Sequence, residues 1–122
     1  MFYILVSGKR DFTDFEKFSK CMNEAVSCVD DEITIVEGGA RGTDALAKRY
    51  ALERGFILKE FPADWDKNGR AAGPIRNSEM VDFIKDKENR AAIFFWDGKS
   101  RGTGDCMRKA DRAGILHEIY RI

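Results

Sequence analysis

The chain has 122 residues, of which 43% are hydrophobic and 34% are charged, and its 21 basic and 21 acidic residues give a formal net charge of zero. This composition is typical of one globular domain over residues 1–122 and excludes an intrinsically disordered chain. The charge balance disfavours a general nucleic-acid binder, because such proteins neutralise phosphates with an excess of basic residues.

Two buried strands and one helix are predicted in the first third of the chain. Residues 2–6 form a continuous apolar run, which is typical of a strand buried on both faces. Apolar residues then recur at helical spacing and predict a helix over about 14–29, with Thr13 as the first residue of a capping box. Residues 33–36 form a short β-branched strand, which leads into a glycine-rich segment at 38–44.

The middle of the chain continues the alternation. Apolar residues on one face predict a second helix after the glycine-rich segment, and Gly55 stands where helices commonly end on a left-handed glycine. A third strand begins at residues 56–58. Residues 62–73 are predicted to form a loop, and Pro74 suits the first position of a third helix.

The last third of the chain repeats the pattern once more. A buried strand at 91–96 precedes a second glycine-rich segment at 97–104, and a fourth helix then runs to Gly114, before a last strand at 115–120. Five strands therefore alternate with four helices. This order predicts an α/β fold, namely a single Rossmann-like doubly wound domain with a mostly parallel five-stranded sheet.

Seven of the eleven glycines follow predicted strands. Ligands of open parallel sheets bind beyond the carboxyl ends of the strands, where glycine lets the backbone approach a ligand and helix N-termini favour an anion. We therefore expect phosphate-binding loops here, with tight turns that bind nothing as the alternative. The segments match neither a Walker A loop nor a Rossmann GxGxxG fingerprint.

Polar residues in and beside these segments complete the predicted site. Arginine suits bidentate phosphate recognition, and Arg76 in a first helical turn is disfavoured unless an anion is bound there. Thr43 and Thr103 have an alternative role as helix N-caps. Trp65 either stacks on a base or anchors its loop to the domain. The candidate ligand-binding residues are Gly8, Arg10, Gly38, Gly39, Arg41, Gly42, Thr43, Asp44, Arg76, Asn77, Gly98, Ser100, Gly102 and Thr103.

Five motifs together carry a family resemblance. They are Ser7-Gly8-x-Arg10-x-Phe12, Gly38-Gly39-Ala40-Arg41-Gly42-Thr43-Asp44, Pro62-Ala63-Asp64-Trp65, Ala72-Gly73-Pro74-Ile75-Arg76-Asn77 with Met80, and Trp96-Asp97-Gly98-x-Ser100-x-Gly102-Thr103. In combination they resemble the YspA-type branch of the SLOG superfamily, which also includes Lonely-guy phosphoribohydrolases, DprA-type proteins and the nucleotide-sensing domains of TRPM channels. The resemblance covers almost the whole chain and implies a Rossmann-like fold with a site for a nucleotide or a nucleotide-derived ligand.

The resemblance leaves three functions open: a sensor or sequestering protein for such a ligand, an N-glycosidase for nucleoside 5′-monophosphates, or a DprA-like binder of single-stranded DNA. The neutral charge disfavours DNA. The Lonely-guy motif Pro-Gly-Gly-x-Gly-Thr-x-x-Glu ends in a catalytic glutamate, and Cys106 stands at that position here. The resemblance therefore weakens the enzymatic interpretation, for which Asp105, Asp44 and Arg76 are the candidate catalytic residues.

The remaining expectations concern partners and compartment. Three cysteines without a CxxC pair indicate reduced thiols in the cytoplasm, and one histidine beside them gives no zinc pattern. We expect no metal and no cofactor. No apolar run approaches the ~20 residues of a membrane span, so we expect no membrane partner. A homodimer or higher homo-oligomer stays open.

Overall fold

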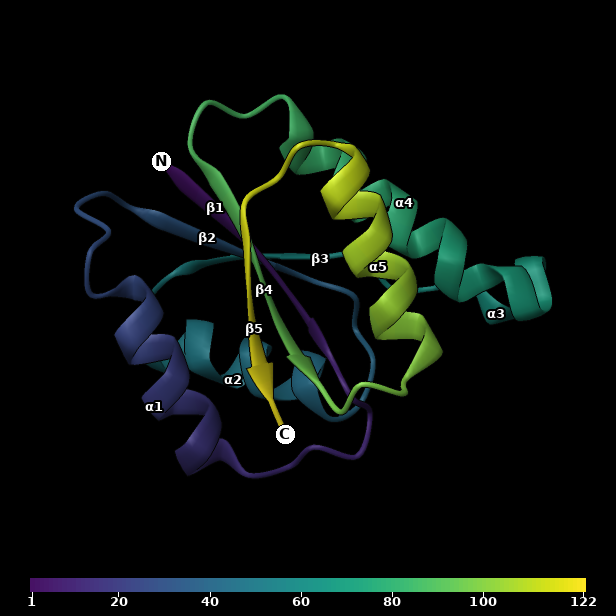
Figure 1. Cartoon of the computed structure of the whole chain (residues 1–122), viewed down its shortest axis with the longest axis horizontal. Helices are drawn as coiled ribbons and strands as arrows, with labels where there is room; N and C mark the ends of the chain where they lie inside the picture. The colour runs from purple at the N-terminus through teal and green to yellow at the C-terminus, as the bar shows by residue number, and fades with distance from the viewer.

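Five strands form one sheet in the order β3-β2-β1-β4-β5, and all neighbouring strands are parallel (Figure 1). In the computed structural model, which describes residues 1–122, the strands are β1 (Phe2–Gly8), β2 (Ile33–Glu37), β3 (Ile57–Glu60), β4 (Arg90–Trp96) and β5 (His117–Arg121). The helices are α1 (Phe15–Val26), α2 (Thr43–Arg54), α3 (Trp65–Asn68), α4 (Ala72–Lys85) and α5 (Arg101–Arg112), with a 3-10 turn η1 at Gly69–Ala71.

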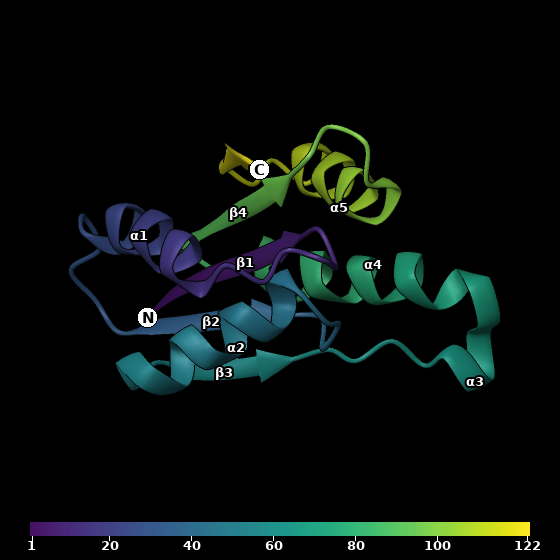
Figure 2. The same ribbon diagram turned by 90° about the horizontal axis from the view of Figure 1, so that it is seen from below.

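Helices cover both faces of the sheet, as Figures 1 and 2 show. The apolar side chains of β1 alternate between the two faces, because successive residues of a strand point to opposite sides. Ile4 and Val6 pack with α1 and α2, whereas Leu5 packs with α4 and α5. The expected doubly wound α/β architecture is therefore confirmed, with a sheet that is parallel throughout.

The predicted start of the first helix was wrong by one residue. Asp14 is the N-cap of α1, and its carboxylate accepts a hydrogen bond from the Lys17 N–H at 3.1 Å. Thr13 therefore has no capping role. The helix ends at Val26, and Val29 still packs against the core from a turn in which its N–H donates to the Val26 carbonyl. The helical spacing of Val29 thus extended the prediction beyond the helix.

The predicted loop at 62–73 contains α3 and η1. Asp64 caps α3 by accepting a hydrogen bond from the Lys67 N–H at 3.0 Å. Helix α3 buries no residue, so the sequence shows no apolar periodicity that predicts it. Helix α4 begins at Ala72, which places Pro74 third in the helix. A proline is tolerated there because the first N–H groups of a helix have no intrahelical acceptor.

The sheet order places a topological switch point between β1 and β4. The chain leaves β1 for α1 on one face of the sheet, and it leaves β4 for α5 on the opposite face. The two connections diverge and leave a crevice at the carboxyl ends of these strands, where ligands of such folds bind. No helix of the chain has the length and apolar character needed to cross a lipid bilayer.

Candidate functional site

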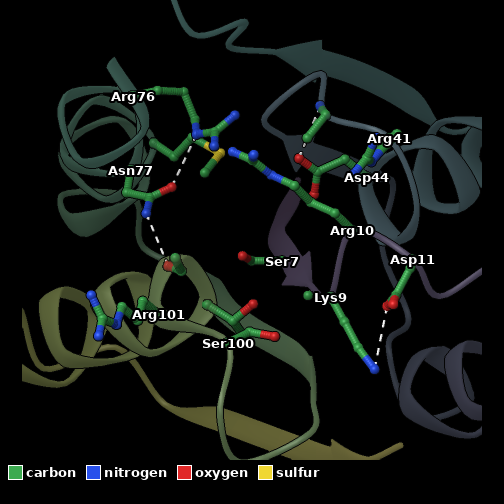
Figure 3. Close-up of a pocket in the computed structure, with 15 residues that line it drawn as sticks. Ser7, Lys9, Arg10, Asp11, Arg41, Asp44, Arg76, Asn77, Ser100 and Arg101 are labelled. Atoms are coloured by element: carbon green, nitrogen blue, oxygen red, sulfur yellow. Dashed lines mark hydrogen bonds and ion pairs between the residues drawn. The ribbon is translucent and has the colours of Figure 1, made fainter. Parts of the chain in front are cut away.

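A cavity of about 430 Å³ lies at this switch point. Its volume falls within the ~300–1,000 Å³ typical of small-molecule sites. Nine of the residues expected from the sequence line it, namely Gly8, Arg10, Arg41, Asp44, Arg76, Asn77, Ser100, Gly102 and Thr103. The structure adds Ser7, Lys9, Asp11, Ala40, Met80 and Arg101 to the lining. Figure 3 shows how side chains from four segments converge there.

The loops after β1 and β2 pack directly against each other beside the cavity. Gly42 has a φ of +73°, and a Cβ at this position would lie 2.2 Å from the Arg10 carbonyl oxygen. The next residue, Thr43, donates its hydroxyl to the Lys9 carbonyl at 2.9 Å and its N–H to the same oxygen at 3.2 Å. Gly42 and Thr43 therefore join the two loops and do not line the cavity.

Arg76 is held in the wall of the cavity with only 7% of its surface exposed. Its Nη1 donates to the Gly38 carbonyl, and its Nε donates to Asn77 Oδ1 at 3.0 Å. A Cβ at Gly38 would lie 2.3 Å from the Arg76 guanidinium, so only glycine leaves room for this side chain. Both acceptors are neutral, and no carboxylate forms an ion pair with Arg76.

Asn77 extends this network to the loop after β4. Its Nδ2 donates to the Gly102 carbonyl at 3.1 Å and to Asp105 Oδ2 at 3.1 Å. Side chains of α4 therefore connect the glycine-rich segment after β2 with the one after β4. The geometry of the cavity is fixed by hydrogen bonds between parts of the chain that are far apart in the sequence.

The charges that line the cavity are unbalanced. Four arginines and Lys9 face two aspartates, Asp11 and Asp44. Lys9 forms ion pairs with Asp11 at 3.3 Å and Asp97 at 3.7 Å, whereas none of the four arginines forms one. In Figure 3 the side chains of Arg10 and Arg76 extend toward each other. Facing cations that form no ion pair attract an anion into the space between them.

Helix α5 begins at the edge of the cavity. The Asp97 carboxylate holds the preceding loop by accepting the N–H groups of Lys99 and Ser100, both at 2.8 Å. Ser100 is the N-cap residue, but its side chain caps nothing, and the Ser100 carbonyl accepts from the Gly104 N–H. The three N–H groups between them have no backbone acceptor and stay available to an anion. Thr103, third in the helix, is not its N-cap.

Asp44 is the one buried carboxylate in the cavity wall, with 6% of its surface exposed. Its Oδ2 accepts a hydrogen bond from the Ala40 N–H at 3.2 Å. Burial raises the pKa of Asp44 to about 6, although that hydrogen bond and the charges of Arg76 and Arg10 act in the opposite direction. Asp44 therefore changes charge close to neutral pH, as a group that accepts or donates a proton must.

Comparison with known proteins identifies the family. Residues 2–68 match the model of the YspA, cpYpsA-related SLOG family. The chain belongs to this family. It is also 35% identical over 117 residues to the Gene 61 protein of Mycobacterium phage D29. The aligned region spans 92% of this chain and 90% of that protein. The expected resemblance to the YspA-type SLOG branch is thus confirmed.

Solved structures are also similar to the chain. One of them is described as a predicted subunit of tRNA methyltransferase from Methanocaldococcus jannaschii. The two chains are 12% identical with a TM-score of 0.44, and the similarity covers 98% of this chain and 67% of the other.

Several predicted residues of this SLOG domain lie outside the cavity lining. Gly98 packs against Arg121, where a Cβ would lie 2.9 Å from a guanidinium nitrogen. The N–H of Gly39 donates to the Glu37 carboxyl at 3.0 and 3.1 Å. With Gly38, Gly42 and Thr43, these residues support the loops from behind and do not face the cavity.

Position 106 and its neighbour take no part in the cavity surface of this SLOG domain. Cys106 is fully buried in the core beneath it, and burial raises the pKa of its thiol to about 12, so the thiol stays neutral. Asp105 Oδ2 accepts hydrogen bonds from Asn77 and, at 2.9 Å, from Lys109 Nζ. Asp105 does not line the cavity. Among the candidate catalytic residues, only Asp44 and Arg76 do.

Sequence reasoning missed Glu37, the last residue of β2. It is fully buried, and burial together with the neighbouring Glu60 carboxyl raises the pKa of its own carboxyl well above the ordinary value. It supports the loop through the Gly39 N–H. An acidic residue placed directly between a β-branched strand and a pair of glycines was the available signal.

Proposed function

We propose that the chain binds a nucleotide or a nucleotide-derived ligand in the switch-point cavity and acts by sensing or sequestering it. The observation that carries the proposal is Arg76, a cation with only 7% of its surface exposed whose hydrogen-bond acceptors are both neutral. Burying an ion without a counter-charge is costly, and an anionic group in the cavity would offset that cost. Family membership favours a nucleotide as the source of the anion.

A phosphate group fits the donors that surround the cavity. A guanidinium offers planar, charge-assisted hydrogen bonds to phosphate oxygens, and Arg76 is already oriented by Gly38 and Asn77. The N-terminus of α5 adds unpaired backbone N–H groups and the positive end of the helix dipole. The exposed guanidinium of Arg10 lies across the cavity and supplies a second cation.

Titration calorimetry with AMP, ADP-ribose and cyclic nucleotides tests the proposal. We expect at least one of these ligands to bind, and Arg76→Ala to weaken binding about tenfold or more, because a hydrogen bond to a charged group contributes about 1.5–3 kcal/mol. Arg10→Ala should weaken the same ligand. Since Arg10 is exposed, that variant tests the site without threatening the fold.

Arg112→Ala is the matched control. Arg112 is an exposed arginine in the last turn of α5, outside the cavity lining, so the variant loses the same charge without touching the site. Its affinity should equal that of the natural chain. The proposal fails if no nucleotide of the panel binds, or if all three arginine variants weaken binding equally.

A second candidate function, hydrolysis of the N-glycosidic bond of a nucleoside 5′-monophosphate, is favoured by Asp44 alone. Its carboxylate lies in the cavity wall near two arginines and titrates near neutral pH, and a carboxylate stabilises an oxocarbenium-like transition state. Chromatographic detection of free base released from AMP would decide between the two. An enzyme should lose release on Asp44→Asn while still binding AMP; a sensor releases no base at all.

A further inference from the structure

Trp65 is a large aromatic side chain that the fold leaves half exposed. It is the first residue of α3, a helix that buries no residue, and 48% of its surface is exposed. Its indole N–H donates to no group of the chain, in contrast to Trp96, whose Nε1 donates to the Ser100 carbonyl at 3.0 Å. A tryptophan that anchors a loop buries its ring, because burial is what stabilises the contact. Trp65 does this only in part.

The indole of Trp65 is not part of the cavity lining, but it contacts an arginine that is. The Arg10 guanidinium lies over its ring, 5.2 Å from the centroid, and Arg10 lines the cavity. A Cβ built at Gly73 would lie 3.5 Å from Trp65 Cη2 and 4.0 Å from Arg76 Nη2. Trp65 therefore contacts the guanidinium of Arg10, and its ring edge and the guanidinium of Arg76 both approach Gly73.

The position of this ring is fixed by the segment that carries it. Asp64 caps α3 through the Lys67 N–H, and the Gly69 N–H donates back to the Trp65 carbonyl. The ring edge lies beside Gly73, in the first turn of α4, 3.5 Å from where a Cβ would stand, which is an ordinary van der Waals distance. The segment thus holds an aromatic surface beside the cavity while α3 itself buries nothing.

We propose that Trp65 is the stacking platform for the base of the nucleotide, which makes it a specificity-determining residue of the site. The inference rests on the proposed function: phosphate is bound by the arginines and the α5 N-terminus, and the base extends over the rim onto the indole. Every base has a face that stacks on an aromatic ring, and such stacking contributes more than an exposed cation–π contact. A base can therefore share the indole with Arg10 or displace the guanidinium from it.

The test compares ligands that differ only in the base. AMP and ribose 5-phosphate share the sugar and the phosphate, and ribose 5-phosphate lacks the base. Calorimetry measures both ligands on the natural chain and on Trp65→Ala and Trp65→Phe. We expect Trp65→Ala to weaken AMP about tenfold or more and to leave ribose 5-phosphate unchanged, because only the stacked base is lost. Trp65→Phe keeps an aromatic face and should retain most of the AMP affinity.

The outcomes separate this inference from the proposed function. If Trp65→Ala weakens both ligands equally, the ring only holds the loop in place, and the stacking role is refuted while phosphate binding stands. If it weakens neither, the ring has no part in binding. If the natural chain binds neither ligand and no other nucleotide of the panel, both proposals fail together. Because about half of the Trp65 surface is exposed and α3 buries no residue, the ligand-free variants should stay folded with a melting temperature only slightly below that of the natural chain, which a thermal scan verifies.

Discussion

Replacing Asp44 by asparagine separates the cost of a buried charge from the geometry of the cavity. The side chain of Asp44 has 6% of its surface exposed and accepts the Ala40 N–H at 3.2 Å. Asparagine has nearly the same shape and keeps an oxygen that can accept this hydrogen bond. The substitution therefore removes the negative charge and the titration while it preserves the contact.

The magnitude and sign follow from the pKa of Asp44, which burial raises from 3.8 to about 6. A tenfold change in an acid dissociation constant corresponds to about 1.4 kcal/mol, so ionising Asp44 in the folded chain costs about 3 kcal/mol. Between pH 3.8 and about 6 the folded state binds more protons than the unfolded state, and the free energy of unfolding falls as pH rises. Above this window the full cost is present.

Urea unfolding of both chains from pH 3.5 to pH 7, in buffers without phosphate, measures the effect. We expect the two free energies of unfolding to agree near pH 3.5. At pH 7 Asp44→Asn should be more stable than the natural chain by about 3 kcal/mol. Carboxyl groups that do not interact with Asp44 titrate in both chains and cancel in the difference. The charge of Asp44 also raises the pKa of Glu37, so its removal relieves Glu37 and acts on the difference in the same direction.

The sign of the difference in free energy of unfolding shows whether burial or attraction to the arginines dominates the pKa of Asp44. Arg76 and Arg10 both act to lower the pKa of Asp44, so their attraction competes with desolvation. If the natural chain becomes the more stable one as pH rises, then attraction to the arginines outweighs burial, and Asp44 is already their counter-ion. A difference that does not change with pH would show that Asp44 is hydrated in the folded chain. Either result would refute the reasoning.

Three further substitutions test the local geometry. Gly42→Ala combines a left-handed backbone with a Cβ placed 2.2 Å from the Arg10 carbonyl, so urea unfolding should show a loss above the ~1–2 kcal/mol of the backbone strain alone. A loss below about 0.5 kcal/mol would mean that the loops separate easily. Asp14→Ala removes the cap of α1 and should cost about 1 kcal/mol, whereas Thr13→Ala should stay within about 0.5 kcal/mol. A larger loss of stability for Thr13→Ala than for Asp14→Ala would show that Thr13 is the N-cap of α1.

The architecture was predictable because each strand carries its own signal. The apolar runs at 2–6 and 91–96 correspond to β1 and β4, two neighbouring strands inside the sheet. They are continuous because a strand that is buried on both faces has apolar residues at successive positions. The termini of the helices were less predictable. At α1 both Thr13 and Asp14 suit an N-cap, and only the position of the backbone decides between them. At α3 nothing is buried, so no periodic pattern exists to detect.

The position of the cavity was predictable from the sequence, but the contacts that each of the predicted residues makes were not. Glycine-rich segments after strands locate the carboxyl edge of the sheet. Whether a given glycine faces a ligand or a neighbouring loop depends on contacts between distant parts of the chain. Gly38 accommodates Arg76, which is 38 positions away, and Gly42 accommodates the backbone of Arg10. No local pattern distinguishes these two from Gly8, which does line the cavity.

The hydrogen bonds around Arg76 explain why its charge can act on a ligand. They fix the orientation of the guanidinium through the Gly38 carbonyl and Asn77, and Asn77 is itself fixed by the Gly102 carbonyl. These acceptors are neutral, so they position the cation without cancelling it. A cation held rigid before an anion arrives loses little conformational entropy on binding. An ion pair with a carboxylate at the same place would have satisfied the charge internally and left less of it to attract a phosphate.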